Sequence, residues 1–148
     1  MDAERALDVL NELIETCRDG EQGFRTAAEA VTEPHLQGLF RAYAEQRAEF
    51  VAELSAEVRR LGGDPDRRGS VAGSLHRGWM NIRSVVSGGN QAAIVAEAER
   101  GEDSARAAYE RALRESTLPP GIAGIVERQA ARVREAHDRV RALRERAA

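Results

Sequence analysis

Apolar residues recur at alternating steps of three and four along most of the chain, which is the spacing of one face of an α-helix. Residues 3–31 carry the first such stripe, formed by Leu7, Leu10, Ile14, Cys17, Phe24, Ala28 and Val31. A second stripe follows Thr32 and Pro34, which offer a helix cap and a first-turn proline. It consists of Leu36, Phe40, Tyr43, Phe50, Leu54 and Leu61. A glycine pair ends this segment, so two long helices are predicted in the N-terminal part of the chain.

Three further helices are predicted beyond a loop of glycine, proline and aspartate at residues 62–70. A short one covers residues 71–87. Two long ones cover residues 91–115, with Asn90 as a cap, and about 122–146, and the sequence Leu-Pro-Pro-Gly separates them. Their stripes are Val95, Ala98, Ala105, Tyr109 and Leu113 in the first and Ile122, Val126, Val133, Ala136, Val140 and Leu143 in the second.

The lengths of these segments predict how they are connected. The four long ones have about 25 to 29 residues each, whereas the short one spans only about 25 Å. If the short helix carries the chain back along the bundle, the second and third long helices run parallel, and the order becomes up, down, down, up. That is the layout of a ferritin-like four-helix bundle with one crossover. A plain antiparallel array of five helices is the alternative. In both, residues 1–148 form a single all-α domain.

Polar residues interrupt the stripe of every long helix near its middle. At about 1.5 Å per residue along alternating directions, five of them reach similar heights: Glu21, Arg47, Glu99, Glu102 and His137. Gln129 lies about two turns away. Tyr43 and Tyr109 lie one or two turns from their neighbours Arg47 and Glu102. A buried carboxylate is costly unless it is paired or bound to a metal, so this polar layer is the candidate functional site.

Two interpretations of the polar layer compete. In one, Glu and His side chains bind iron or manganese, as they do in carboxylate-bridged bundles; the candidate ligands are Glu21, Glu99, Glu102 and His137. In the other, Arg47 neutralises Glu21 and Glu102, and the histidine and a tyrosine hydroxyl complete a hydrogen-bonded network. The second is favoured, because buried charges are usually paired and arginine keeps a positive charge that repels a dication.

Composition and charge narrow the range of partners. The formal net charge is -3 and the charged residues of both signs are interleaved, so no basic face for nucleic acid is predicted. No run approaches the roughly 18 apolar residues of a membrane span, and the N-terminus has no signal pattern. A cytoplasmic protein without a membrane partner is therefore expected. Cys17 is the only cysteine, so an intrachain disulfide is impossible, and its place on a stripe indicates packing.

Weaker candidates lie outside the polar layer. His76 and Trp79 are about one turn apart on the short helix and are expected to cover the bundle. His35 is expected to be exposed. Homo-oligomerisation is left open, because long alanine-rich helices can pack against a copy of themselves. The segment bearing Trp79 is the first surface to test for it.

Several stretches of the sequence resemble a bacterial ferritin-like domain family of unknown function, a four-helix-bundle group related by fold to rubrerythrin and ferritin. They are spread over most of the chain and read LNELIETCRDGEQGFRTAAE, GSVAGSLHRGW, AEAERGEDSARAAYERAL and VREAHDRVRALR. The resemblance implies the fold and supplies no assigned activity.

The wider ferritin-like superfamily takes one Glu from the first helix, a Glu-x-x-His from the second, one Glu from the third and a second Glu-x-x-His from the fourth. The resemblance implies that Glu21 stands for the first ligand and His137 for the last histidine. Glu99 or Glu102 stands for the ligand on the third helix. The chain departs from the pattern in two places, because AEQRAEF on the second helix holds no histidine and Arg134 replaces the last Glu. These departures argue against a complete di-iron centre and leave a reduced or single-metal site.

Two functions follow from these alternatives. The favoured one is a non-catalytic ferritin-like bundle acting as a structural or interaction protein, and the resemblance implies a role in stress physiology. The other is a metal-binding oxidoreductase-like protein with an incomplete iron or manganese site. No cofactor is established by the pattern itself.

Overall fold

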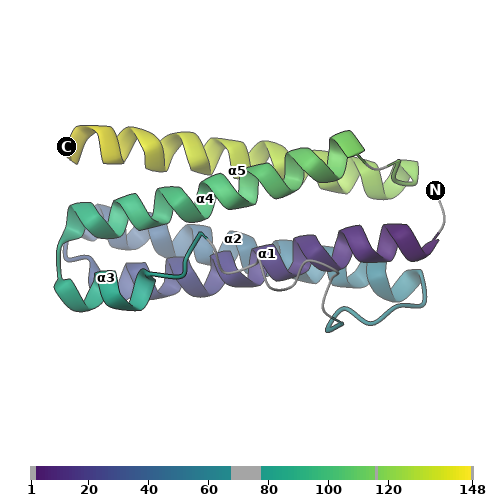
Figure 1. The fold of residues 1–148 in the computed structure, drawn as a ribbon, viewed down its shortest axis with the longest axis horizontal. Coiled ribbons are helices and arrows are strands. Elements are labelled where there is room, and N and C mark those ends of the chain that lie inside the picture. Colours follow the sequence, from purple (N-terminus) through teal and green to yellow (C-terminus); the bar gives the residue numbers. More distant parts are fainter. Residues whose placement is uncertain (1–2, 68–77, 116, 148) are drawn as a thin grey trace.

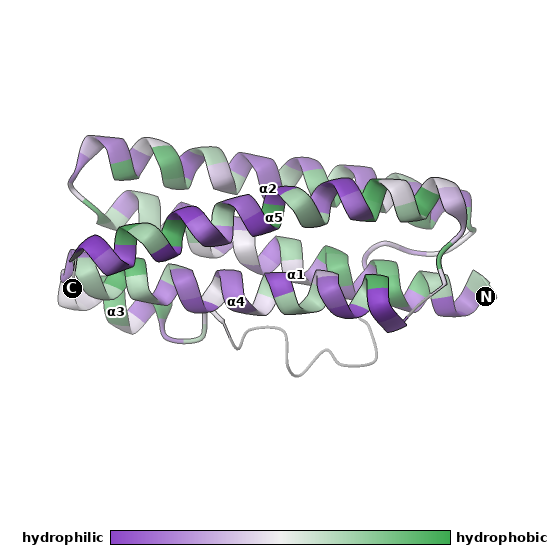
Figure 2. Cartoon of the chain, turned by 90° about the horizontal axis from the view of Figure 1, so that it is seen from above, coloured by the Kyte–Doolittle hydropathy of each residue, from purple (hydrophilic) through white to green (hydrophobic). Residues whose placement is uncertain are grey.

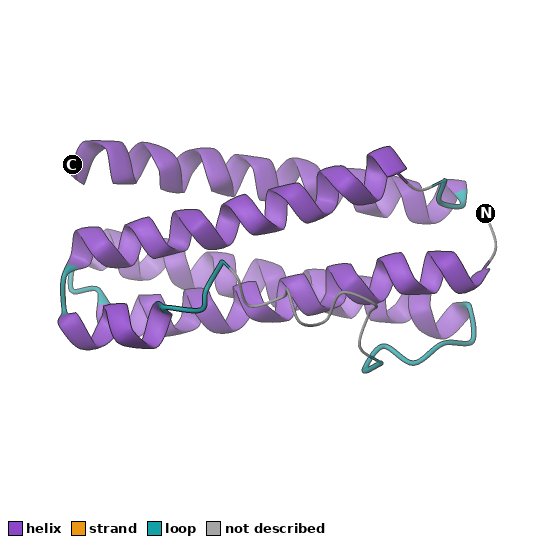
Figure 3. Cartoon of the chain, viewed as in Figure 1, coloured by secondary structure: helices purple, strands orange, loops and turns teal. Residues whose placement is uncertain are grey.

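Five α-helices are present in the computed structural model, which describes residues 3–67, 78–115 and 117–147 (Figure 1). They are α1 (Ala3–Ala30), α2 (Pro34–Arg60), α3 (Ile82–Gly88), α4 (Gln91–Glu115) and α5 (Pro120–Ala147). The four long helices contain 28, 27, 25 and 28 residues, close to the predicted lengths. Because these ranges contain no strand, the predicted all-α class is confirmed (Figure 3).

Side-chain caps define where two of the long helices begin. The Glu33 carboxylate accepts hydrogen bonds from two backbone N–H groups in the first turn of α2, at 2.8 and 3.0 Å. The N-terminal cap of α2 is therefore Glu33, whereas the sequence predicts Thr32 as the cap. At the start of α4, Oδ1 of Asn90 accepts the backbone N–H of Ala93 at 3.1 Å, which is the predicted cap.

The short helix is smaller than predicted. α3 covers Ile82–Gly88, whereas the periodicity predicts a helix over residues 71–87. Residues 78–81 form a turn, and residues 71–77 lie outside the described part of the chain. Tertiary contacts decide the conformation of this turn, because Trp79 is buried and the Glu97 carboxylate accepts the backbone N–H of Asn81 at 2.8 Å. With 7 residues, α3 is too short to be a fifth member of the bundle.

The long helices form two antiparallel pairs, α1 with α2 and α4 with α5, which lie one above the other (Figure 1). The α1 helix also packs against α4, and α3 contacts both of them. By contrast, α2 and α5 touch at few points. The two chain ends lie at opposite ends of the bundle (Figure 1).

Apolar residues recur along each long helix between polar ones (Figure 2). Their buried members form two clusters. The first contains Leu10, Leu13, Ile14, Cys17, Phe50, Leu54, Val58, Tyr109, Leu118, Ile122, Val126 and Val133, together with four alanines. The second contains Phe24, Phe40, Trp79, Ile94, Val95 and Val140 among others. No helix in the described residues is long and apolar enough to cross a membrane.

The break between the two clusters falls near the middle of the bundle. On α1 it lies between Cys17 and Phe24, and on α2 between Ala44 and Phe50. Arg47 occupies the break on α2 and is buried. The core is thus divided by polar side chains, as the interrupted stripes predict.

Candidate functional site

A buried ion pair joins α2 to α4 at the break between the clusters. Nη1 of Arg47 donates to Oε1 of Glu102 at 2.7 Å, and Nη2 donates to Oε2 at 2.6 Å. The two side chains are 1% and 0% exposed. The guanidinium also lies 5.5 Å from the centre of the Phe24 ring, and Nε donates to the side-chain oxygen of Gln46 at 3.3 Å. Both oxygens of the carboxylate are therefore engaged by one arginine.

The charges of this pair stabilise each other against the cost of burial. Burial by itself opposes the charged form of Arg47, but the attraction of Glu102 and its hydrogen bonds more than offset it, so the pKa of Arg47 is raised. A guanidinium is charged at any pH at which the protein folds. The centre of the bundle thus carries a permanent positive charge, neutralised by one carboxylate.

Gly20 of α1 makes room for the guanidinium. A Cβ atom at this position would lie 3.1 Å from Nη1 and 3.5 Å from Cγ of Arg47. Glycine in a helix interior costs roughly 1 kcal/mol relative to alanine, so this close approach explains why α1 has a glycine at its middle. The apolar stripe assigns the inward position to Glu21, but in the structure Gly20 takes this position against the Arg47 side chain.

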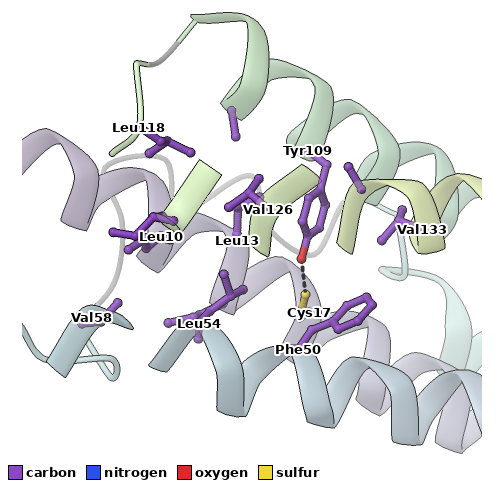
Figure 4. Close-up of a cluster of buried hydrophobic side chains, with 14 of the residues drawn as sticks. Leu10, Leu13, Cys17, Phe50, Leu54, Val58, Tyr109, Leu118, Val126 and Val133 are labelled. Atoms are coloured by element: carbon purple, nitrogen blue, oxygen red, sulfur yellow. Dashed lines mark hydrogen bonds between the residues drawn. The ribbon is translucent and has the colours of Figure 1, made fainter. Parts of the chain in front are cut away.

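A second set of polar side chains lies beside the ion pair and extends to the surface. The Tyr109 hydroxyl donates to Oε1 of Gln129 at 2.7 Å, and its oxygen lies 3.1 Å from Sγ of Cys17 (Figure 4). Nε2 of Gln129 donates to Oε1 of Glu53 at 2.9 Å, and Arg128 pairs with the other Glu53 oxygen. Since Tyr109 gives its only hydrogen to Gln129, the Cys17 thiol is the donor to Tyr109. We call these residues the polar relay.

Burial sets the chemistry of the inner end of the polar relay. It raises the pKa of Cys17 to about 11, although the charge of Arg47 acts in the opposite direction. Burial also raises the pKa of Tyr109 well above its usual value. Because the thiolate is the reactive form of cysteine, Cys17 is a packing residue at neutral pH and not a nucleophile.

The four candidate metal ligands point to different partners. Glu21 is 25% exposed and pairs with Arg25 on its own helix at 3.0 Å. The structure therefore does not place Glu21 in the polar layer. Glu99 pairs with Arg144 of α5, and Glu102 is held by the arginine already described.

His137 is buried between α4 and α5, but its neighbours are surface carboxylates. Its Nε2 lies 2.6 Å from Oδ1 of Asp103, and its Nδ1 lies 3.0 Å from Oδ1 of Asp138. Among the residues that the structure describes, no group of three His, Cys, Asp or Glu side chains is placed to hold a metal ion. The arrangement does not fit the iron or manganese centre that a ferritin-like fold implies.

The remaining predicted members of the layer lie on either side of the ion pair. Tyr109 and Gln129 are buried in the polar relay. Tyr43 is only partly buried, and its ring centre lies 5.3 Å from that of Phe24. The predicted layer is thus spread along the bundle, with Arg47 and Glu102 at its centre.

Trp79 is held in a gap that the apolar stripes do not indicate. A Cβ atom at Gly23 of α1 would lie 2.2 Å from Cδ2 of the indole, and one at Gly101 of α4 would lie 2.2 Å from Cε2. Trp79 is 7% exposed, so it covers the bundle and offers little surface to a partner. Glycines inside two long helices were the available signal for this gap. His76, its predicted neighbour, lies outside the described residues.

These features define a class of protein, an all-α helical bundle with charged and hydrogen-bonded groups at its centre. The chain belongs to the family described as a domain of unknown function (DUF2383), whose model matches residues 5–115. The matched range ends with α4, so α5 lies beyond it. No curated protein matches the chain. The family description assigns no activity, which agrees with what the sequence resemblance implies.

Proposed function

We propose that this chain is a ferritin-like bundle that acts in the cytoplasm as a structural or interaction protein, with a role in stress physiology, and that it catalyses no metal-dependent reaction. The observation that carries the proposal is the ion pair of Arg47 and Glu102 at the centre of the bundle. A guanidinium cannot bind a metal through its nitrogens, and its charge repels a dication beside the same carboxylate.

The arrangement of the helices supports the ferritin-like part of the proposal. Four long helices with short connections inside each pair, and one long connection between α2 and α4, are what this layout requires. In the proposed layout α2 and α4 run parallel, and the order is up, down, down, up. In this proposal the chain has a ferritin-like fold, but an ion pair takes the place of a metal site at its centre.

The partners of the other candidate ligands support the non-catalytic part. Glu21 and Glu99 are each paired with an arginine, and among the described residues neither forms a metal-binding group with His137. The raised pKa of Cys17, caused by burial, also removes the one thiol of the chain from nucleophilic chemistry at neutral pH.

Elemental analysis of protein purified without chelator or affinity tag tests the proposal. We expect iron, manganese and zinc far below one equivalent per chain, and no rise in Tm when Fe²⁺ or Mn²⁺ is added, because a ligand that binds only the folded state raises Tm. The competing prediction is an oxidoreductase-like protein with an incomplete metal site. It requires near-stoichiometric metal and a rise in Tm that Glu102→Ala abolishes. Glu110→Ala, at an exposed position of α4, is the matched control.

Self-association stays a prediction of the interaction role. Trp79 itself is buried, but Met80 beside it is 66% exposed, so the segment that bears Trp79 stays the first surface to test. Light scattering coupled to size-exclusion chromatography measures the assembly state directly.

A further inference from the structure

The two sides of α5 are held by different kinds of contact. Along one side α5 packs extensively against α4, whereas toward α2 the contacts are few. Hydrogen bonds also bridge α2 and α5. They join Arg128 and Gln129 to Glu53, and Arg139 to His35, whose Nη2 and Nε2 atoms are 3.3 Å apart. We call this side of the bundle the α2–α5 seam.

The buried apolar residues of α5 are mostly valine and alanine. Among the described residues they are Ile122, Val126, Ala130, Val133, Ala136 and Val140. On α1 and α2 the corresponding positions include leucine and phenylalanine, such as Leu10, Phe24, Phe40 and Leu54. Because burial stabilises in proportion to apolar area, α5 is the long helix that the core holds least strongly on the side of the seam.

The polar relay crosses this seam and continues into the core. Its members come from all four long helices: Cys17 from α1, Glu53 from α2, Tyr109 from α4 and Gln129 from α5. Every hydrogen in it points along the same direction, from the Cys17 thiol through Tyr109 and Gln129 to the Glu53 carboxylate. Hydrogen bonds aligned in this way strengthen one another, so the loss of the terminal acceptor weakens the whole series.

We propose that Glu53 is a latch, which holds α5 against α2 and whose release lets the seam open locally while α5 stays packed on α4. This conformational property is independent of the proposed function. Opening separates Gln129 from Glu53 and removes the cover over Tyr109 and Cys17. Regions held by few buried contacts open locally at a lower free energy than the whole domain unfolds.

The single cysteine makes the opening measurable. Cys17 is buried at the inner end of the polar relay, so a thiol reagent reaches it only when the bundle opens. The experiment follows the reaction of 5,5′-dithiobis(2-nitrobenzoate) with the folded full chain at pH 8, at several low concentrations of urea. Local opening gives a rate that depends weakly on urea, whereas global unfolding exposes a large surface and gives a steep dependence.

Variants of Glu53 and its neighbours test whether Cys17 is labelled through local opening of the seam or through global unfolding. We expect Glu53→Ala to raise the labelling rate by about tenfold, because the variant loses the hydrogen bonds that Gln129 and Arg128 donate to the carboxylate. Arg128→Ala changes only an exposed partner of the latch and is expected to raise the rate less. Glu49→Ala, about one turn earlier on the exposed face of α2, is the matched control and leaves the rate unchanged.

Two results would overturn the proposal. One is a labelling rate in Glu53→Ala equal to that of the parent chain. The other is a rate in the parent chain that follows urea as steeply as global unfolding does, since Cys17 is then exposed only in the unfolded state. If Glu53→Ala does not fold, Glu53→Gln and Arg128→Ala carry the same comparison, and unchanged rates in both contradict the latch.

Discussion

Replacing Arg47 by methionine removes the positive charge at the centre of the bundle and leaves Glu102 buried without its partner. Both oxygens of Glu102 currently accept from Arg47, and the carboxylate has no exposed surface. Breaking a buried ion pair on one side costs about 3 to 5 kcal/mol, because an uncompensated charge remains. A domain of this size has a total stability of about 5 to 15 kcal/mol, so Arg47→Met should lower Tm by roughly 10 °C.

The double variant Arg47→Met/Glu102→Leu distinguishes the pair from ordinary packing. Because no charge is left in the core, we expect it to recover most of the lost stability, or to exceed the parent chain by about 1 to 4 kcal/mol. Arg132→Met is the control, since Arg132 pairs with Glu135 on the surface at 3.2 Å and should change stability by less than about 1 kcal/mol.

Urea unfolding followed by far-ultraviolet circular dichroism measures all three variants. If Arg47→Met costs no more than the Arg132→Met control, the ion pair does not have the role assigned to it. A double variant as unstable as Arg47→Met would also contradict this role, because the loss then comes from packing volume and not from the unpaired carboxylate.

Three further predictions concern packing, capping and pH. Gly23→Ala should destabilise the protein by about 1 to 3 kcal/mol, because its Cβ would lie 2.2 Å from the Trp79 ring. Gly38→Ala is the control, because a Cβ there has nothing within 4 Å, and it should stabilise the protein by up to about 1 kcal/mol. Urea unfolding measures both variants. Glu33→Ala should cost about 0.5 to 2 kcal/mol, because two N–H groups of α2 lose their acceptor, and thermal unfolding measures it. The pKa of Cys17 is raised from 9.0 to about 11, so the unfolded chain releases this proton first. Stability should therefore fall as pH rises through that window, with a smaller slope in Cys17→Ala.

The long helices of this chain are readable from its apolar periodicity, and so are four of the nine buried polar positions in the described residues. Arg47, Glu102, Gln129 and His137 interrupt apolar stripes, and all four are buried. Periodicity identifies the face of a helix on which a residue lies, and this is sufficient to predict that these four residues are buried.

The apolar stripes do not predict which side chains the charged residues pair with. Glu21 lies next to the inward position of α1, but Gly20 takes that position because the Arg47 guanidinium needs its space. Glu99 lies on the flank of α4, where a long arginine of α5 reaches it. Such pairings follow from the rotation of each helix by fractions of a turn, and from side-chain lengths on other helices.

The turn before α3 was missed for a related reason. The stripe around Trp79 is compatible with a helix, but the indole enters a gap created by glycines on α1 and α4, which are distant in sequence. Contacts of this kind override local propensity. The glycines themselves are visible in the sequence, and their position inside long helices is the signal to examine.

The most direct test of the central claim is anomalous diffraction from crystals of natively purified protein, measured at the iron and manganese absorption edges. We predict no anomalous peak within bonding distance of Glu102, and clear density for the guanidinium of Arg47 at hydrogen-bonding distance from both oxygens of this carboxylate. A peak bonded to Glu102 or His137, with the guanidinium of Arg47 turned away, would contradict it.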